Sequence, residues 1–150
     1  MNQNRLPVRR WSRRHVPAFA PVPLRHRGDG WTPLRQAAFL GALAETGCVR
    51  TAARRVGLSR ETAYRLRKHP GAGSFAAAWD KVLGRESGRA RKVTPDELRQ
   101  RALFGLLKPR MYGGRHVSTE RKADNSALLR FLAQIARSNF SEEPDEVRSP

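Results

Sequence analysis

Three residues, Gly57-Leu58-Ser59, separate two short helical segments and limit how the middle of this chain can fold. The segment before them, Val49 to Val56, is rich in alanine, and glycine commonly ends a helix in a left-handed conformation. Ser59 is a preferred residue for starting the next helix, which we expect to run to about Lys68. Two short helices joined by so tight a turn must pack on each other, so the pattern predicts a helix-turn-helix.

The inner face of such a unit needs a small residue where the helices touch and apolar residues around it. Ala53, four residues before Gly57, meets the first requirement. The second is met by Val56, Leu58, Ala63 and Leu66.

Long polar side chains lie on the outward side once this inner face is buried. Arg60, Tyr64 and Lys68 share one i, i+4, i+8 row, and Glu61 and Arg65 share the next. Arginine bonds guanine through two donors, so Arg60 and Arg65 are the best candidates for base contacts. The residues that we predict to contact double-stranded DNA are Arg54, Arg55, Ser59, Arg60, Glu61, Tyr64, Arg65 and Lys68.

The other members of this set have different expected roles. Ser59, at a helix N-terminus, suits a phosphate, while Arg54 and Arg55 would follow the sugar-phosphate backbone. Glu61 either accepts a hydrogen bond from cytosine or pairs with Arg65 one turn later, and we favour the pair.

The charge of the chain agrees with a polyanionic partner. Of 150 residues, 30 are Lys or Arg and 13 are Asp or Glu, which gives a net charge of +17. Eight basic and two acidic residues fall between positions 32 and 69, around the predicted turn. A basic RNA-binding or ribosome-associated protein would also carry such charge, but an aromatic platform for stacking bases is missing.

The rest of the sequence predicts a mainly α-helical protein, a small bundle with an N-terminal helix-turn-helix. Thr32-Pro33 starts a helix that ends at Gly47, and another begins at Ser74. Thr94-Pro95-Asp96-Glu97 forms a capping box for a helix that we expect to continue through Leu107, with Pro109 ending it. A short β-hairpin is expected near residues 110–117 around Gly113-Gly114, and a last helix from about Asp124.

These segments divide the chain into five predicted parts. They are a flexible, disordered basic arm (1–30), the helix-turn-helix domain (31–83), a hinge (84–93), a helical and hairpin assembly region (94–140) and a disordered acidic tail (141–150). Arginines of the arm either add affinity in a narrow minor groove or take no part.

Residue patterns for catalysis or cofactor binding are missing. The four histidines are scattered, and Cys48 is the single cysteine, so neither a metal site nor a catalytic site is expected and no cofactor is implied. We expect a cytoplasmic, nucleoid-associated protein that is not an enzyme and has no membrane partner.

The stretch AARRVGLSRETAYRLRK, residues 52–68, resembles the homeodomain-like helix-turn-helix proteins of phage and prophage origin, including terminase small subunits. The likeness extends less specifically over roughly residues 31–135. It implies DNA recognition and homo-oligomers, here through the C-terminal helices.

Two roles follow and remain open at this point. The first is a transcriptional regulator or phage-derived DNA-recognition protein. The second is a terminase-small-subunit-like adaptor that holds viral DNA and docks a packaging motor. The partners expected are therefore double-stranded DNA, further copies of the chain, and a motor or regulatory protein.

Overall fold

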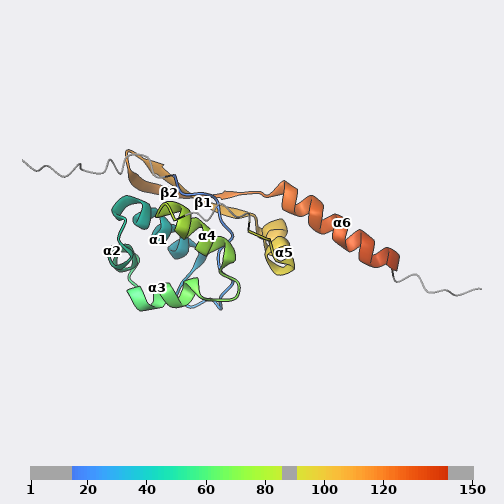
Figure 1. The fold of residues 1–150 in the computed structure, drawn as a ribbon, viewed down its shortest axis with the longest axis horizontal. Coiled ribbons are helices and arrows are strands. Elements are labelled where there is room, and N and C mark those ends of the chain that lie inside the picture. Colours follow the sequence, from blue (N-terminus) through green and yellow to red (C-terminus); the bar gives the residue numbers. More distant parts are fainter. Residues whose placement is uncertain (1–14, 86–90, 142–150) are drawn as a thin grey trace, which may run out of the picture.

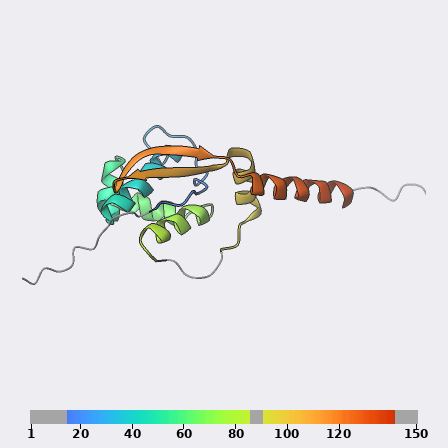
Figure 2. The same ribbon diagram turned by 90° about the horizontal axis from the view of Figure 1, so that it is seen from above.

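The computed structural model describes residues 15–85 and 91–141. In these residues the protein is mainly helical, as predicted, with one small antiparallel sheet. The elements are α1 (Pro33–Thr46), α2 (Val49–Arg55), α3 (Arg60–Arg67), α4 (Gly73–Val82), α5 (Pro95–Phe104), β1 (Leu106–Tyr112), β2 (Arg115–Lys122) and α6 (Asn125–Ser141). Helices α1 to α4 gather at one end, the hairpin lies across α1, and α6 projects from the other end beside α5 (Figures 1 and 2).

Helix α1 begins and ends where the sequence predicts. The Thr32 hydroxyl accepts a hydrogen bond from the Arg35 amide at 3.2 Å, and Pro33 occupies the first turn. Gly47 then adopts a positive φ of 65°, which glycine reaches without strain, and its amide donates to the Leu43 carbonyl. This helix lies at the centre of the core.

An aromatic cluster fills the space between α1 and α4. Phe39 of α1 lies 4.9 Å from Trp79 and 6.0 Å from Phe75 of α4, measured between ring centroids. Phe19 and Trp31 pack edge-on against Phe75, with centroids 6.0 Å and 6.5 Å away. Rings of this size bury a large apolar area, so this cluster contributes strongly to hydrophobic stabilisation.

The prediction of a disordered arm over residues 1–30 is wrong from His15 onward, and residues 1–14 lie outside the described part. Val16 and Phe19 are fully buried. Phe19 exchanges two backbone hydrogen bonds with Leu107 of β1, both 2.9 Å long. Fully buried Gln36 of α1 accepts from the Val22 amide at 2.7 Å and donates to its carbonyl at 3.1 Å. The prolines of this segment prevent a helix but allow an extended chain, which β1 and Gln36 hold in place.

The prediction that the fifth helix continues through Leu107 is also wrong. Helix α5 starts at the expected capping box, where the Glu97 amide donates to the Thr94 hydroxyl, but it ends at Gly105, whose φ of 71° and ψ of −158° favour glycine. Leu106 starts β1 instead. Pro109 lies within this strand on the side facing away from β2, as Leu107 does, so its missing amide removes no bond between the strands.

The hairpin is therefore longer than the predicted span of 110–117, although its turn is the expected Gly113-Gly114 with φ of 57° and 80°. It packs closely on α1, because a Cβ added at Gly41 would collide with the His116 ring. Leu107 is buried in the same core as α1 and α4. The core thus crosses the boundary expected between a DNA-binding domain ending at 83 and an assembly region starting at 94.

The remaining two predicted parts are described only in part. Residues 86–90 of the hinge and 142–150 of the acidic tail lie outside the described residues, and Ser141 is the last residue of α6. Arg91, at the end of the expected hinge, forms an ion pair with Glu97, which raises the pKa of the guanidinium. This pair fastens the chain to α5.

Candidate nucleic-acid interface

The turn between α2 and α3 has the backbone geometry that its sequence predicts. Gly57 has a φ of +75°, and its amide donates to the Arg54 carbonyl at 3.0 Å. The next amide, of Leu58, reaches back to the Ala53 carbonyl at 2.9 Å, so the end of α2 is closed by two bonds. The Ser59 hydroxyl then accepts from the Thr62 amide at 3.3 Å and caps α3.

The inner faces of α2 and α3 are buried as expected. Ala53 and Ala63 are fully inaccessible, and Leu66 is 4% exposed. Val56 and Leu58 are half-buried, and Val56 packs against the core. With these side chains fixed inside, the opposite sides of both helices must face solvent.

Arg67 holds α3 on α4 through contacts that the sequence did not predict. Arg67 forms an ion pair with Asp80 at 2.8 Å and lies over the Trp79 ring, 5.3 Å from its centroid. The guanidinium also donates to the Ala76 carbonyl at 3.4 Å. Arg67 and Asp80 are thirteen residues apart and lie on different helices, so the spacing of residues within one helix does not predict this pair.

The same tryptophan also receives Tyr64, which we predicted as a DNA contact. The Tyr64 and Trp79 rings lie 5.4 Å apart at an angle of 45°, and Tyr64 is 41% exposed. Part of the Tyr64 ring thus packs against α4, which fixes the side chain and leaves only the rest of the ring at the surface.

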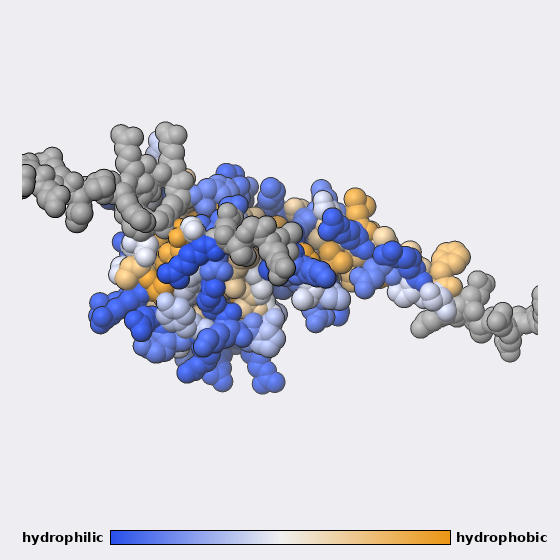
Figure 3. Space-filling view, viewed as in Figure 1, coloured by the Kyte–Doolittle hydropathy of each residue, from blue (hydrophilic) through white to orange (hydrophobic). Residues whose placement is uncertain are grey.

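Most of the predicted basic residues lie exposed on the outward faces of α2 and α3. Within the described residues, none of the following has an ion-pair partner: Arg54, Arg60, Arg65 and Lys68. Arg55 differs, because it pairs with Glu45 of α1 at 3.1 Å. Figure 3 shows mostly hydrophilic residues around α3, with some apolar residues at the surface near α2.

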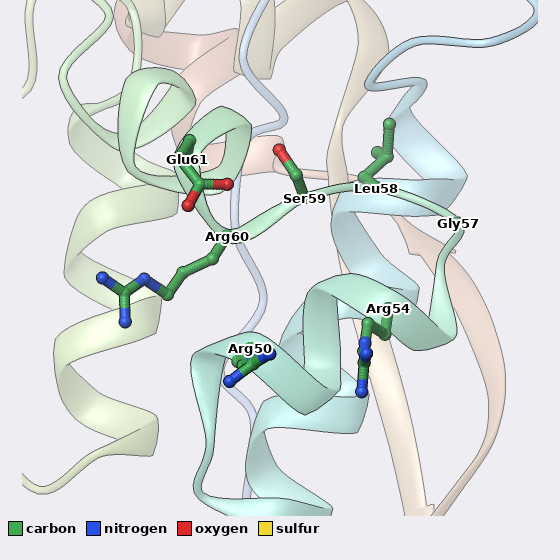
Figure 4. A pocket seen from close by; sticks show the side chains of 7 residues that line it. All are labelled: Arg50, Arg54, Gly57, Leu58, Ser59, Arg60 and Glu61. Carbon is green, nitrogen blue, oxygen red and sulfur yellow. The ribbon is translucent and has the colours of Figure 1, made fainter.

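An open hollow of about 570 Å³ separates the outward side of α2 from the start of α3. Arg50 and Arg54 line it from α2, while Ser59, Arg60 and Glu61 line it from the turn and α3 (Figure 4). Arg50 was not among the predicted residues. It lies one helical turn before Arg54 on the same face, a spacing that could have identified it.

Glu61 lies in this basic hollow, and its predicted ion pair with Arg65 is wrong. Its own backbone amide and the Ser59 hydroxyl stabilise the charged carboxylate, and the charges of Arg60 and Arg50 add to the effect. Together they lower the pKa of Glu61 below its ordinary value. A carboxylate in the first turn is drawn back to the helix N-terminus and away from a residue one turn later.

Within residues 15–85 and 91–141, no group of three or more His, Cys, Asp or Glu side chains is placed to hold a metal ion. His69 accepts a hydrogen bond from the Gly71 amide at 3.0 Å and stabilises the end of α3. No helix in these ranges has the length and apolar character needed to cross a membrane.

Comparison with known proteins adds no relative. No protein-family model matches the chain, and no curated protein or solved structure matches it. The resemblance of residues 52–68 to phage helix-turn-helix proteins therefore stays a prediction.

Proposed function

We propose that α2, the Gly57-Leu58-Ser59 turn and α3 form a helix-turn-helix that binds double-stranded DNA. The observation that carries this proposal is the group of exposed, unpaired cations shared by the outward faces of the two helices: Arg50, Arg54, Arg60, Arg65 and Lys68. Within the described residues none of these five cations forms an ion pair, although Glu61 lies beside Arg50 and Arg60, and a surface with this excess of positive charge attracts the phosphates of a duplex and releases their counterions. The rigid backing of these helices gives that surface a fixed shape.

In this proposal α3 enters the major groove. Arg60 and Arg65 contact base edges, since a guanidinium matches the two acceptors of guanine. Arg50 and Arg54 of α2 contact phosphates along one strand, together with Ser59 at the N-terminus of α3. Arg55 contributes less, because its charge is already paired with Glu45.

The biological role that we propose is transcriptional regulation. Regulators of this class bind as two-fold dimers on sites with matching symmetry. A packaging adaptor, the alternative, requires a ring of subunits around or beside DNA. The number of copies in solution separates the two roles.

Selection of bound duplexes from a random library, followed by affinity measurements, tests the proposal. Arg65→Ala should weaken binding to the selected site by about 1–3 kcal/mol and relax the preference at one base pair. Arg54→Ala should weaken binding to selected and random duplexes alike and reduce the salt dependence by about one unit of slope. Arg99→Ala, an exposed α5 variant with the same charge change, is the control. Equal effects of the three variants would contradict the proposal.

A further inference from the structure

Helix α6 projects away from the rest of the molecule after its first turns. Ala127 is buried and Phe131 is half-buried where α6 packs on α5, whereas every residue from 132 to 141 is exposed. The Asp124 carboxylate fixes the start of the helix by accepting from the Ala127 amide at 3.0 Å and pairing with Arg101 at 2.7 Å. The projecting part is therefore held firmly at one end and touches nothing else in the described chain (Figures 1 and 2).

The projecting helix has a wide apolar face. At 3.6 residues per turn, one side carries Leu128, Leu129, Leu132, Ala133, Ile135, Ala136 and Phe140, with the polar Asn139 near its C-terminal end, and the other side carries Arg130, Gln134, Arg137, Ser138 and Ser141. Leu129 is 68% exposed, Leu132 51% and Phe140 84%. Orange patches along α6 in Figure 3 show the same feature. A contiguous apolar face of this kind marks an interaction surface.

We propose that this face is covered by α6 of a second copy of the chain, lying antiparallel to the first. Charge selects both the partner and its direction. The sequence that follows Ser141 contains Glu142, Glu143, Asp145 and Glu146, with Arg148 as its one basic residue. The residues just before α6 include Arg121 and Lys122, both exposed. An antiparallel pair puts the end of α6, after which the acidic sequence continues, next to the basic start of α6 in the other copy, whereas a parallel pair puts the two α6 ends together.

The exposed apolar residues at the two ends of α6 agree with the same direction. Leu103 and Phe104, at the end of α5, are 55% and 62% exposed. They lie at the start of α6, because a Cβ at Gly105 would collide with the Lys122 carbonyl. Phe140 lies at the far end. Antiparallel pairing brings Phe140 of one copy towards Phe104 of the other, and a parallel pair leaves both in water.

The pairing centres on Leu132. With that residue on the two-fold axis, position 128 of one helix faces position 136 of the other. The small side chains of Ala133 and Ala136 then let the two helices approach closely. Such an interface is closed and self-complementary, so it produces a dimer and no larger assembly.

The mass of the full chain in solution tests the dimer and does not depend on DNA binding. Sedimentation equilibrium of the natural chain should give twice the monomer mass. Leu129→Glu combined with Leu132→Glu should give the monomer with unchanged thermal melting of the rest of the fold. The matched control, Gln134→Glu with Ser138→Glu, adds the same two charges to the polar side and should stay dimeric. A monomeric natural chain, a ring, or two pairs of variants with the same mass would overturn the proposal.

Disulfide crosslinking tests the direction in a background with Cys48→Ser. Chains with Leu128→Cys should crosslink to chains with Ala136→Cys when the two are mixed under oxidising conditions, and neither should crosslink efficiently alone. Efficient crosslinking of each variant to itself would show a parallel pair and overturn the proposal. Replacing the four acidic residues after Ser141 with their amides should weaken the dimer at low salt, and an unchanged dissociation constant would overturn the charge argument on which the direction rests.

Discussion

Glu61 is the one acidic side chain among the cations that line the hollow between α2 and α3. Because its pKa is lowered by its own amide, by Ser59 and by the nearby arginines, it stays ionised at neutral pH. A carboxylate there accepts hydrogen bonds and repels phosphate, so in the proposed complex it faces a base donor such as the amino group of cytosine.

Glu61→Gln tests this role. The amide still accepts but also donates, so we expect tighter binding to random duplex because one negative charge is lost. At the selected site we expect discrimination to fall by about 1–3 kcal/mol at a single cytosine position. Affinity measured on the selected site and its single-base variants would show this. Unchanged discrimination at every position would mean that Glu61 serves only the helix N-terminus.

Phe19 belongs to the N-terminal segment that the sequence wrongly predicted to be disordered, and its full burial predicts a loss of stability on truncation. Phe19→Ala should reduce the free energy of unfolding by about 3–5 kcal/mol, because it removes a fully buried ring from the aromatic cluster. Tyr112→Ala, which truncates an aromatic side chain at the exposed hairpin turn, should change it by less than about 0.5 kcal/mol. Urea denaturation of both variants is the measurement, and equal stabilities would mean that the segment from His15 is not part of the core.

Among the secondary-structure elements, α5 and the start of α6 are linked by one carboxylate, Asp124, in addition to their apolar packing. Burial alone would raise the pKa of Asp124, but the Ala127 amide and the Arg101 guanidinium outweigh it and hold the pKa below its ordinary value. The folded state thus binds the proton less readily than the unfolded chain does. The contribution of ionised Asp124 to the free energy of unfolding is complete above about pH 5 and is lost as the pH falls through the pKa of Asp124 in the folded state.

Asp124→Asn keeps an oxygen for the Ala127 amide and removes the charge that pairs with Arg101. We expect the variant to be less stable than the natural chain at pH 7 by about 1–2 kcal/mol, as for a charge-assisted hydrogen bond. The difference should shrink as the pH is lowered below about 4, near the ordinary carboxyl pKa. Thermal melts from pH 7 to pH 3 provide the data. Glu45→Gln, which breaks the exposed pair with Arg55, is the control and should cost less than about 1 kcal/mol. A difference independent of pH would contradict the assignment.

Elements with local signals were predicted well. Thr32, Ser59 and Thr94 start helices because their side chains bond amides three residues later, and this information is local in sequence. Residues 15–24 and 106–109 were misassigned because their structure depends on partners far along the chain. Phe19 pairs with Leu107, and Val22 with Gln36, contacts that no helical or strand periodicity encodes. Proline in both segments was interpreted as a sign of disorder or of a helix end, although it is compatible with an extended edge.

At the candidate interface, too, local features were predictable from the sequence and contacts with distant elements were not. The exposure of Arg54, Arg60, Arg65 and Lys68 was predictable because α2 and α3 are regular and their inner faces are easily identified. The partners that modify the surface come from other elements: Glu45 of α1 pairs with Arg55, and Trp79 of α4 holds Tyr64 and Arg67.

At the scale of the whole molecule, the charged surface of α2 and α3 and the apolar face of α6 lie on different parts of the structure (Figure 3). In the proposed two-fold dimer built on α6, the candidate DNA-binding surfaces of the two copies lie at opposite ends. We expect such a dimer to bind two separated half-sites, one for each copy, if the proposed function is right.

The proposed binding of duplex DNA by the outward face of α2 and α3 can be tested by comparing two double variants. The dissociation constants of two double variants, Arg60→Ala with Arg65→Ala and Arg99→Ala with Arg137→Ala, are measured on the same duplex at the same salt concentration. Both remove two positive charges, but only the first removes them from α3. We predict that the first variant loses at least about tenfold more affinity, equivalent to about 1.4 kcal/mol. Equal losses, or a natural chain with no affinity for duplex DNA, would contradict the claim.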